Sequence, residues 1–175
     1  LRAFRWKLVS ALIVIHADVF RALPPLVVII LFYFAFPAAG WPMSAFTATW
    51  LALTLVLSAF AEEIFWAGII AVPRGQYEAA RSTGMTAAQT LFWVVLPQAI
   101  RMTIPPLTNR TIAITKGTAL GSVVALSEIL GQASSAASLA ANPTPYTLGA
   151  IAYLVLFLPV VVFSRWVETR FAWKR

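Results

Sequence analysis

Charged and amide side chains interrupt two long apolar segments of this 175-residue chain. Glu63 lies in one segment, and Asn109, Arg110 and Lys116 lie in the other. A charge inside a membrane costs several kcal/mol unless it is paired or hydrated, so such residues are candidates for a transport path. Together they place one anionic, two cationic and one amide group along such a path.

A structural role for the same charges stays open. Glu63 and Arg110 each lie about ten residues, roughly 15 Å, from the same end of their segments, so Glu62 or Glu63 could pair with Arg110 and hold the segments together. The two roles are compatible. A catalytic pair of Glu62 and Glu63 is not expected, because adjacent helical residues point about 100° apart. The chain has no cysteine and one histidine, His16, so no metal site is predicted.

The composition places these residues in a membrane. The chain is 61% hydrophobic and 11% charged, whereas about a quarter of the residues in a soluble domain are charged. A soluble protein of this length could not bury so much apolar surface. We therefore predict an all-α integral membrane helix bundle, with residues 1–175 forming a single domain. Four spans are expected, at 23–36, 44–72, 99–116 and 146–166. The apolar stretch 8–15 is too short to cross alone and is either an interfacial helix or an extension of the first span.

The net charge of +7 is distributed in a way that predicts orientation. Basic residues precede the first span, lie between the second and third, and follow the fourth. The turn 37–42 and the stretch 118–145 have none. Since cytoplasmic loops carry the excess of Lys and Arg, both termini and the loop 73–97 are predicted to be cytoplasmic. The excess is thus explained by topology rather than by a nucleic-acid partner.

The loop 73–97 has the pattern of two short helices joined by a glycine. The segment 77–83 favours a helix, and Gly84 suits the left-handed turn that ends one. Thr86 and Gln89 have the spacing of a capping box that begins a second helix. Pro97 is expected to break the chain before the third span. The residues alone are equally compatible with an amphipathic linker on the membrane surface.

Small residues accompany this pattern. Four alanines are expected to be exposed and to allow another protein to approach closely: Ala79, Ala80, Ala87 and Ala88. Glu78 and Arg81 share one face of the first helix, where opposite charges three residues apart stabilise it.

The spacing of the loop resembles a known family signature. Glu78-Ala79-Ala80, Gly84, Val94 and Leu96-Pro97 follow the pattern E-A-A-x3-G-x9-I-x-L-P of ABC importer permeases, with Val94 in place of isoleucine. The segments 20–26 and 99–120 are similar to the corresponding parts of the polar amino acid permeases. The resemblance covers nearly the whole chain. Only the first helix of the family has no counterpart, so we expect four of five spans in an N-terminally truncated chain.

The resemblance implies a type I ABC importer permease fold and a transport role in the bacterial inner membrane. Glu78, Ala79, Ala80 and Gly84 are expected to couple the spans to ABC ATPase subunits, which would bind ATP and Mg. The chain has no GxxxxGK phosphate loop, and it is expected to be neither an enzyme nor the holder of a cofactor. A periplasmic substrate-binding protein, a second permease subunit and membrane lipid are the expected partners.

Three departures from the family pattern leave the substrate open. Trp66 stands where arginine is usual, Gly117 replaces the aspartate of a K-D-T motif, and Arg110 stands where glutamine is common. The polar lining is therefore rearranged. Polar amino acids are the expected substrates, and the alternatives are another small solute, such as an opine or a compatible solute, or an integral membrane enzyme.

Overall fold

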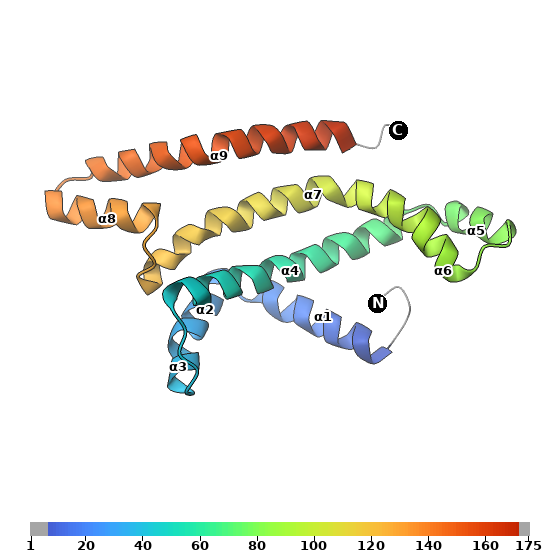
Figure 1. Ribbon diagram of the computed structural model, residues 1–175, viewed down its shortest axis with the longest axis horizontal. Helices are drawn as coiled ribbons and strands as arrows, with labels where there is room; N and C mark the ends of the chain where they lie inside the picture. Colours follow the sequence, from blue (N-terminus) through green and yellow to red (C-terminus); the bar gives the residue numbers. More distant parts are fainter. Residues whose placement is uncertain (1–6, 172–175) are drawn as a thin grey trace.

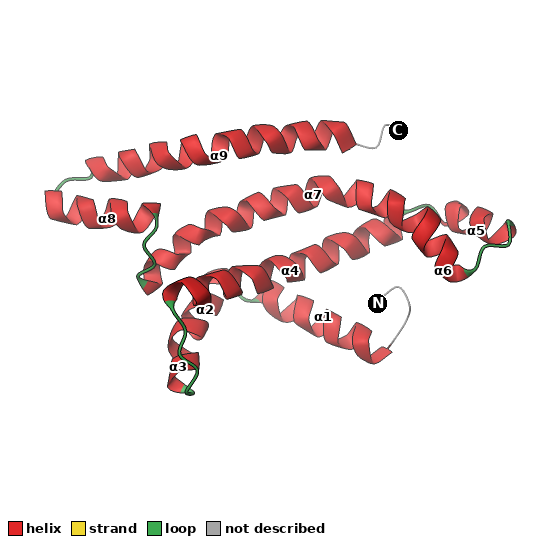
Figure 2. Cartoon of the chain, viewed as in Figure 1, coloured by secondary structure: helices red, strands yellow, loops and turns green. Residues whose placement is uncertain are grey.

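The computed structural model describes residues 7–171, which form helices and connecting turns without a strand (Figure 2). The elements are α1 (Lys7–Ala22), α2 (Pro25–Ile30), the π-helical turn η2 (Leu31–Ala35), α3 (Phe36–Ala38), α4 (Ala45–Ala71), α5 (Arg74–Ser82), α6 (Ala87–Thr90), the π-helical turn η3 (Leu91–Val95), α7 (Leu96–Lys116), the 3-10 helix η4 (Gly117–Val124), α8 (Ile129–Ala140) and α9 (Thr144–Phe171). The predicted helical bundle is confirmed.

Four helices lie side by side in a single layer. α1 packs against α4, α4 against α7, and α7 against α9 (Figure 1). α5 and α6 project from one end of the layer, the end at which α9 finishes, whereas the turn after α3 and the turn between α8 and α9 lie at the opposite end (Figure 1). In the described residues, α4 and α9 are long and apolar enough to cross a membrane, and two bent helix pairs bring the number of candidate spans to four.

Small residues allow α4 to approach its neighbours closely. Ala48, Ala52 and Ala59 are fully buried on this helix. Gly68 faces α7, where a Cβ at its position would lie 3.1 Å from the carbonyl oxygen of Ala99. Small residues of this kind permit tight helix packing in membranes, where no hydrophobic force drives helices together. The core beside them contains larger apolar side chains: Val28, Ile29, Leu53, Val56, Ile114 and Val124.

The first predicted span has a different shape from the expected straight helix 23–36. The pair formed by α1 and the 25–38 segment bends by 102°, at Leu23 and Pro24. Pro24 is extended, with φ −58° and ψ 135°, because the following Pro25 disfavours a helical conformation at its predecessor. Residues 8–15 belong to α1, which packs along α4. They are therefore part of a longer helix than predicted, which turns sharply before the 25–38 segment.

Pro97 does not break the helix that leads into the third span, contrary to the prediction. The helix is continuous from 87 to 116, and the turn η3 precedes Pro97. Pro37 follows η2 at the same offset. A proline ring clashes with the carbonyl four residues earlier and removes one hydrogen bond. The wider π turn relieves both problems, so the helix direction is kept.

A carboxylate positions α8 against α9. The side chain of Glu128 accepts hydrogen bonds from the backbone N–H groups of Leu130 at 2.8 Å and Gly131 at 2.5 Å. The hydroxyl of Tyr153, on α9, donates to the same carboxylate at 2.9 Å. Glu128 thus satisfies the free donors at the start of α8 and ties that helix to its neighbour.

Candidate functional site

The loop between α4 and α7 forms a sharp elbow, which consists of α5, the turn 83–86 and α6. Gly84 has φ +89°, and its N–H donates to the carbonyl of Arg81 at 3.1 Å. The N–H of Thr86 donates to Gln89 Oε1 at 2.8 Å, and the N–H of Gln89 donates to Thr86 Oγ1 at 3.2 Å. The predicted glycine turn and capping box are both confirmed.

Side chains at the end of α5 stiffen the elbow. Ser82 and Thr83 donate their hydroxyl protons to the carbonyls of Ala79 and Ala80, each at 2.8 Å. The guanidinium of Arg81 donates to the carbonyl of Met85, across the turn, instead of pairing with Glu78. Glu78 is exposed and has no ion-pair partner in the part of the chain that the structure describes. Its carboxylate is therefore available to a docked partner.

The alanines of the elbow differ in exposure. Ala79, Ala87 and Ala88 are exposed, as predicted. Ala80 is only 7% exposed, so the prediction that it is exposed is wrong. The reason is that α5 folds back onto α6 and η3, and Ala80 is the buried residue of α5.

An apolar cluster joins the elbow to the ends of the long helices. Val72, Val95 and Ala99 are buried together, with Ile69 and Leu91 packed against them. Only Val72 and Pro73 separate α4 from α5. A displacement of the elbow would therefore reach α4 and α7 directly.

A second group of residues, the polar cluster, connects α1, α4 and α7. Arg21 Nη1 lies 3.2 Å from Glu63 Oε2. The guanidinium carbon of Arg110 lies 3.1 Å from the centre of the Phe60 ring, and that of Arg21 lies 5.8 Å from the same ring. Such a position over an aromatic face stabilises a cation. Arg110 Nε is buried and has no hydrogen-bond partner among the described residues.

Glu63 therefore pairs with Arg21 on α1. In the sequence, Arg21 is one of the basic residues that precede the first span and predict its orientation. The sequence feature that could have predicted this pairing is the position of Arg21 just before Leu23-Pro24-Pro25. The bend at these residues holds the end of α1 beside α4.

Asn109 and Lys116 lie away from the polar cluster. Both line a groove of about 530 Å³ between α7 and α9, together with Ser164, Arg165 and Glu168. Lys116 Nζ is 5.8 Å from the centre of the Phe157 ring on α9. The four predicted path residues thus form two groups, Glu63 with Arg110 on one side of α7 and Asn109 with Lys116 on the other.

Comparison with known proteins gives consistent matches over most of the chain. Residues 3–173 match the family described as "binding-protein-dependent transport system inner membrane component". The probable glutamine ABC transporter permease protein GlnM of Bacillus subtilis (strain 168) is 38% identical over 157 residues, which are 89% of this chain and 72% of that protein. The L-cystine transport system permease protein TcyB of the same organism is 39% identical over 119 residues, 68% of this chain and 51% of that protein.

A solved structure has the same arrangement of helices. The crystal structure of an amino acid ABC transporter with histidines superposes with a TM-score of 0.85 at 37% sequence identity. The match covers 94% of this chain and 76% of that one. The fold of most of this chain therefore recurs in a transporter of known structure.

Proposed function

The chain belongs to the family of binding-protein-dependent transport system inner membrane components, and from this we propose that it is the permease subunit of an ATP-driven importer for polar amino acids. The relatives named for glutamine and cystine and the amino acid transporter structure support this substrate class. The proposed mechanism rests on the elbow, which is exposed, is stabilised by internal hydrogen bonds and packs against the ends of two long helices.

In this proposal, the elbow is the docking point for a separate ATPase subunit that binds ATP and Mg. Glu78 offers an exposed carboxylate for a charge-assisted contact. Ala79 is exposed and small enough for the ATPase surface to come close. Ala80 is buried and helps to hold α5 in place by packing. Gly84 provides the turn. ATPase closure would move the elbow as a rigid body, and α4 and α7 would follow because the cluster around Val72 and Val95 leaves no flexible segment between them.

The polar cluster is the proposed substrate path. Arg110 presents a cation that the Phe60 ring stabilises, and it suits the carboxylate of an amino acid. Glu63 is part-exposed beside it and suits the ammonium group. Asn109 and Lys116 would line a second part of the path, on the α9 side of α7. A second permease subunit would close the path against the open face of the helix layer.

The orientation follows from the distribution of charge. The elbow and the C-terminus are proposed to face the cytoplasm of a bacterial cell. The turn after α3 and the segment containing α8 would face the periplasm, where a substrate-binding protein delivers the amino acid.

A second candidate substrate class is an acidic solute of similar size, such as an opine. Arg110 favours it, since the cluster holds two guanidinium groups around one ring. A transport panel that includes such compounds separates the two classes.

The test of the coupling role compares two glycines of the elbow in the complex reconstituted with its ATPase. Gly84→Val places a β-branched residue at φ +89°, where it is strained by about 1–2 kcal/mol or more, so substrate-stimulated ATP hydrolysis should fall about tenfold. Gly75→Val is the matched control, because a Cβ at either glycine meets nothing within 4 Å but Gly75 has no positive φ.

A second variant addresses docking without changing the backbone. Glu78→Lys reverses the exposed charge and is expected to release the ATPase during purification while the spans remain inserted. Retained co-purification in Glu78→Lys, together with unchanged substrate-stimulated hydrolysis in Gly84→Val, would rule out the elbow as the coupling element.

A further inference from the structure

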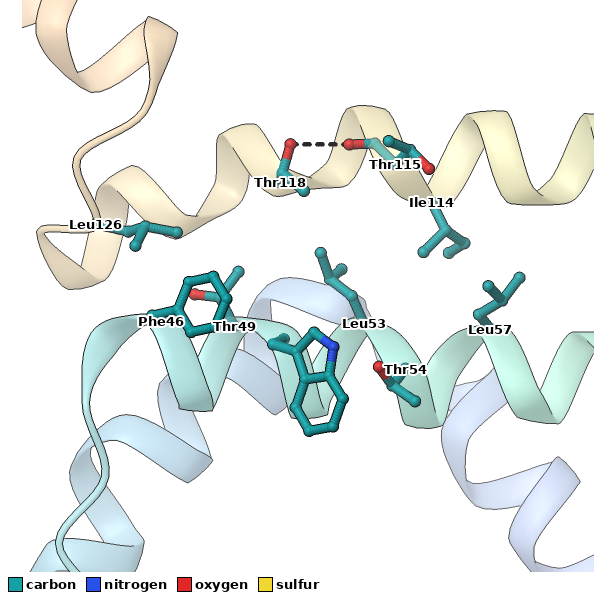
Figure 3. A pocket seen from close by; sticks show the side chains of 10 residues that line it. Phe46, Thr49, Leu53, Thr54, Leu57, Ile114, Thr115, Thr118 and Leu126 are labelled. Carbon is teal, nitrogen blue, oxygen red and sulfur yellow. Dashed lines mark hydrogen bonds between the residues drawn. The ribbon is translucent and has the colours of Figure 1, made fainter. Parts of the chain in front are cut away.

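A small pocket lies between α4 and the segment formed by α7 and η4 (Figure 3). Its volume is about 220 Å³, which is room for several water molecules. Leu53, Leu57 and Ile114 form apolar walls, and four threonines add hydroxyl groups: Thr49, Thr54, Thr115 and Thr118. The pocket is therefore apolar in its walls and carries a few fixed polar groups, as ligand sites do.

Two of the threonines offer hydrogen-bond acceptors only. The hydroxyl of Thr115 donates to the carbonyl of Thr111 at 2.8 Å. The hydroxyl of Thr118 donates to the carbonyl of Thr115 at 2.8 Å (Figure 3). With their protons committed to their own helix, these oxygens can act toward a ligand only as acceptors. Thr49 is 3% exposed, and its hydroxyl has no partner in the described part of the chain.

No charged side chain lines the pocket. An ionised group inside it would lose hydration without gaining a counter-charge, which costs several kcal/mol. The groups that fit are uncharged and carry N–H or O–H donors for the threonine oxygens. A primary amide meets both conditions, because it has two donors and one acceptor.

The pocket begins one helical turn from the polar cluster on both helices. Leu57 precedes Phe60 by three residues on α4, and Ile114 follows Arg110 by four residues on α7. Residues at these spacings lie on one face of a helix, about 5–6 Å apart. A small molecule whose carboxylate is held at Arg110 would thus direct its other end into the pocket.

On the basis of the proposed transport function, we propose that this pocket receives the side chain of the transported amino acid and selects uncharged side chains that end in hydrogen-bond donors. The amide of glutamine is the preferred type. Leucine fills a similar volume without donors, and glutamate replaces the amide with a charge. Thr115 and Thr118 are the residues that determine specificity.

The test measures direct binding of labelled glutamine, leucine and glutamate to the purified permease–ATPase complex without its substrate-binding protein, so that the selectivity of that protein does not contribute. Thr115→Val keeps the side-chain shape and removes the acceptor, and it is expected to weaken glutamine binding about three- to tenfold, as the loss of one hydrogen bond does. Leucine binding should stay unchanged. Thr115→Ser restores the hydroxyl and should restore the preference for glutamine.

Thr111→Val is the matched control. Thr111 is exposed on the same helix and donates its hydroxyl to the carbonyl of Leu107 at 2.9 Å, but it does not line the pocket. An equal ratio of glutamine to leucine binding in Thr115→Val, Thr111→Val and the unchanged chain would overturn the pocket assignment and leave the transport role intact. Absence of saturable binding of any amino acid would instead contradict the proposed function itself.

Discussion

At the scale of single residues, two guanidinium groups lie over one phenylalanine ring. Arg110 and Arg21 both lie over Phe60, and Glu63 supplies an anion to Arg21 at 3.2 Å. Two cations this close repel each other unless negative charge lies nearby. Glu63 therefore does more than join α1 to α4, since it also partly neutralises the Arg21 charge that lies near Arg110.

Removing the carboxylate of Glu63 should destabilise the chain, and the size of the loss should depend on whether Arg21 is present. Glu63→Gln is expected to lower the free energy of unfolding by about 1 kcal/mol, because the pair is part-exposed, with side-chain exposures of 36% and 43%. A loss of this size shifts the midpoint of thermal unfolding by about 2–4 °C in a domain of this length. Thermal unfolding of the purified complex measures it.

The control is a double-mutant cycle. Arg21→Met in the Glu63→Gln background should cost less than Arg21→Met alone, since the unpaired cation is then absent. Strictly additive effects would show that the two side chains do not interact.

Local chemistry at the ends of helices was predictable from residue types. Ser44 caps α4 through a 3.0 Å bond from the N–H of Thr47, and Thr86 with Gln89 caps α6, because each device needs residues only three positions apart. The partner of Glu63 was not predictable in this way. Arg21 is 42 residues away in the sequence, and its position depends on the angle of the bend at Pro24. The two prolines predict a bend there, but they do not predict its angle.

At the scale of elements, two π turns allow prolines to stay within helices. η2 precedes Pro37, and η3 precedes Pro97. The π turn η3 also sets the angular position of the elbow relative to α7, because each residue added or removed within a helix rotates what precedes it by about 100°.

Replacing the proline should therefore change the direction of the elbow. Pro97→Ala restores a donor and removes the ring clash, so η3 is expected to tighten into an α-helical turn and α5 to rotate relative to α4. The chain has no cysteine, so spin labels at Ala79→Cys and Thr54→Cys report the distance between the two elements. Pro106→Ala is the control, since Pro106 lies within regular α7.

An unchanged label distance in Pro97→Ala would show that packing against the elbow, rather than the proline, maintains η3. The length of the apolar segment located the second span, since the 44–72 prediction matches α4 together with its two capping residues. The sequence could not reveal the π turns. A proline in a sequence predicts the end of a helix, and only the tertiary contacts show that these two helices continue through it.

At the scale of the whole molecule, the helices form one layer with two open faces. The apolar windows of α4 and α9 are only 22% and 11% buried within the chain. Exposed aliphatic and aromatic side chains cover α9, including Leu154, Val155 and Phe163. In a membrane, lipid covers such a surface, so the stability of the chain depends on its surroundings.

The layer also predicts which loops share a side of the membrane. The elbow and the C-terminal end of α9 lie at one end, and the turns after α3 and after α8 lie at the other (Figure 1). Single cysteines at Gln76 and Thr169 should react with a membrane-impermeant thiol reagent only after the cells are opened. Cysteines at Trp41 and Asn142 should react in intact spheroplasts. Labelling of Gln76 from outside would reverse the proposed orientation.

The short connection between α4 and α5 has a consequence for how related chains can diverge. Val72 and Pro73 span at most about 7 Å when extended, so an inserted residue there would act as slack and absorb part of any motion before it reached α4. The turn at Asn142 and Pro143 does not need a fixed length, because it is not proposed to transmit motion. Across evolution, chain length is therefore expected to drift at the α8–α9 turn and to stay constant at this joint, whatever solute the lineage has come to carry.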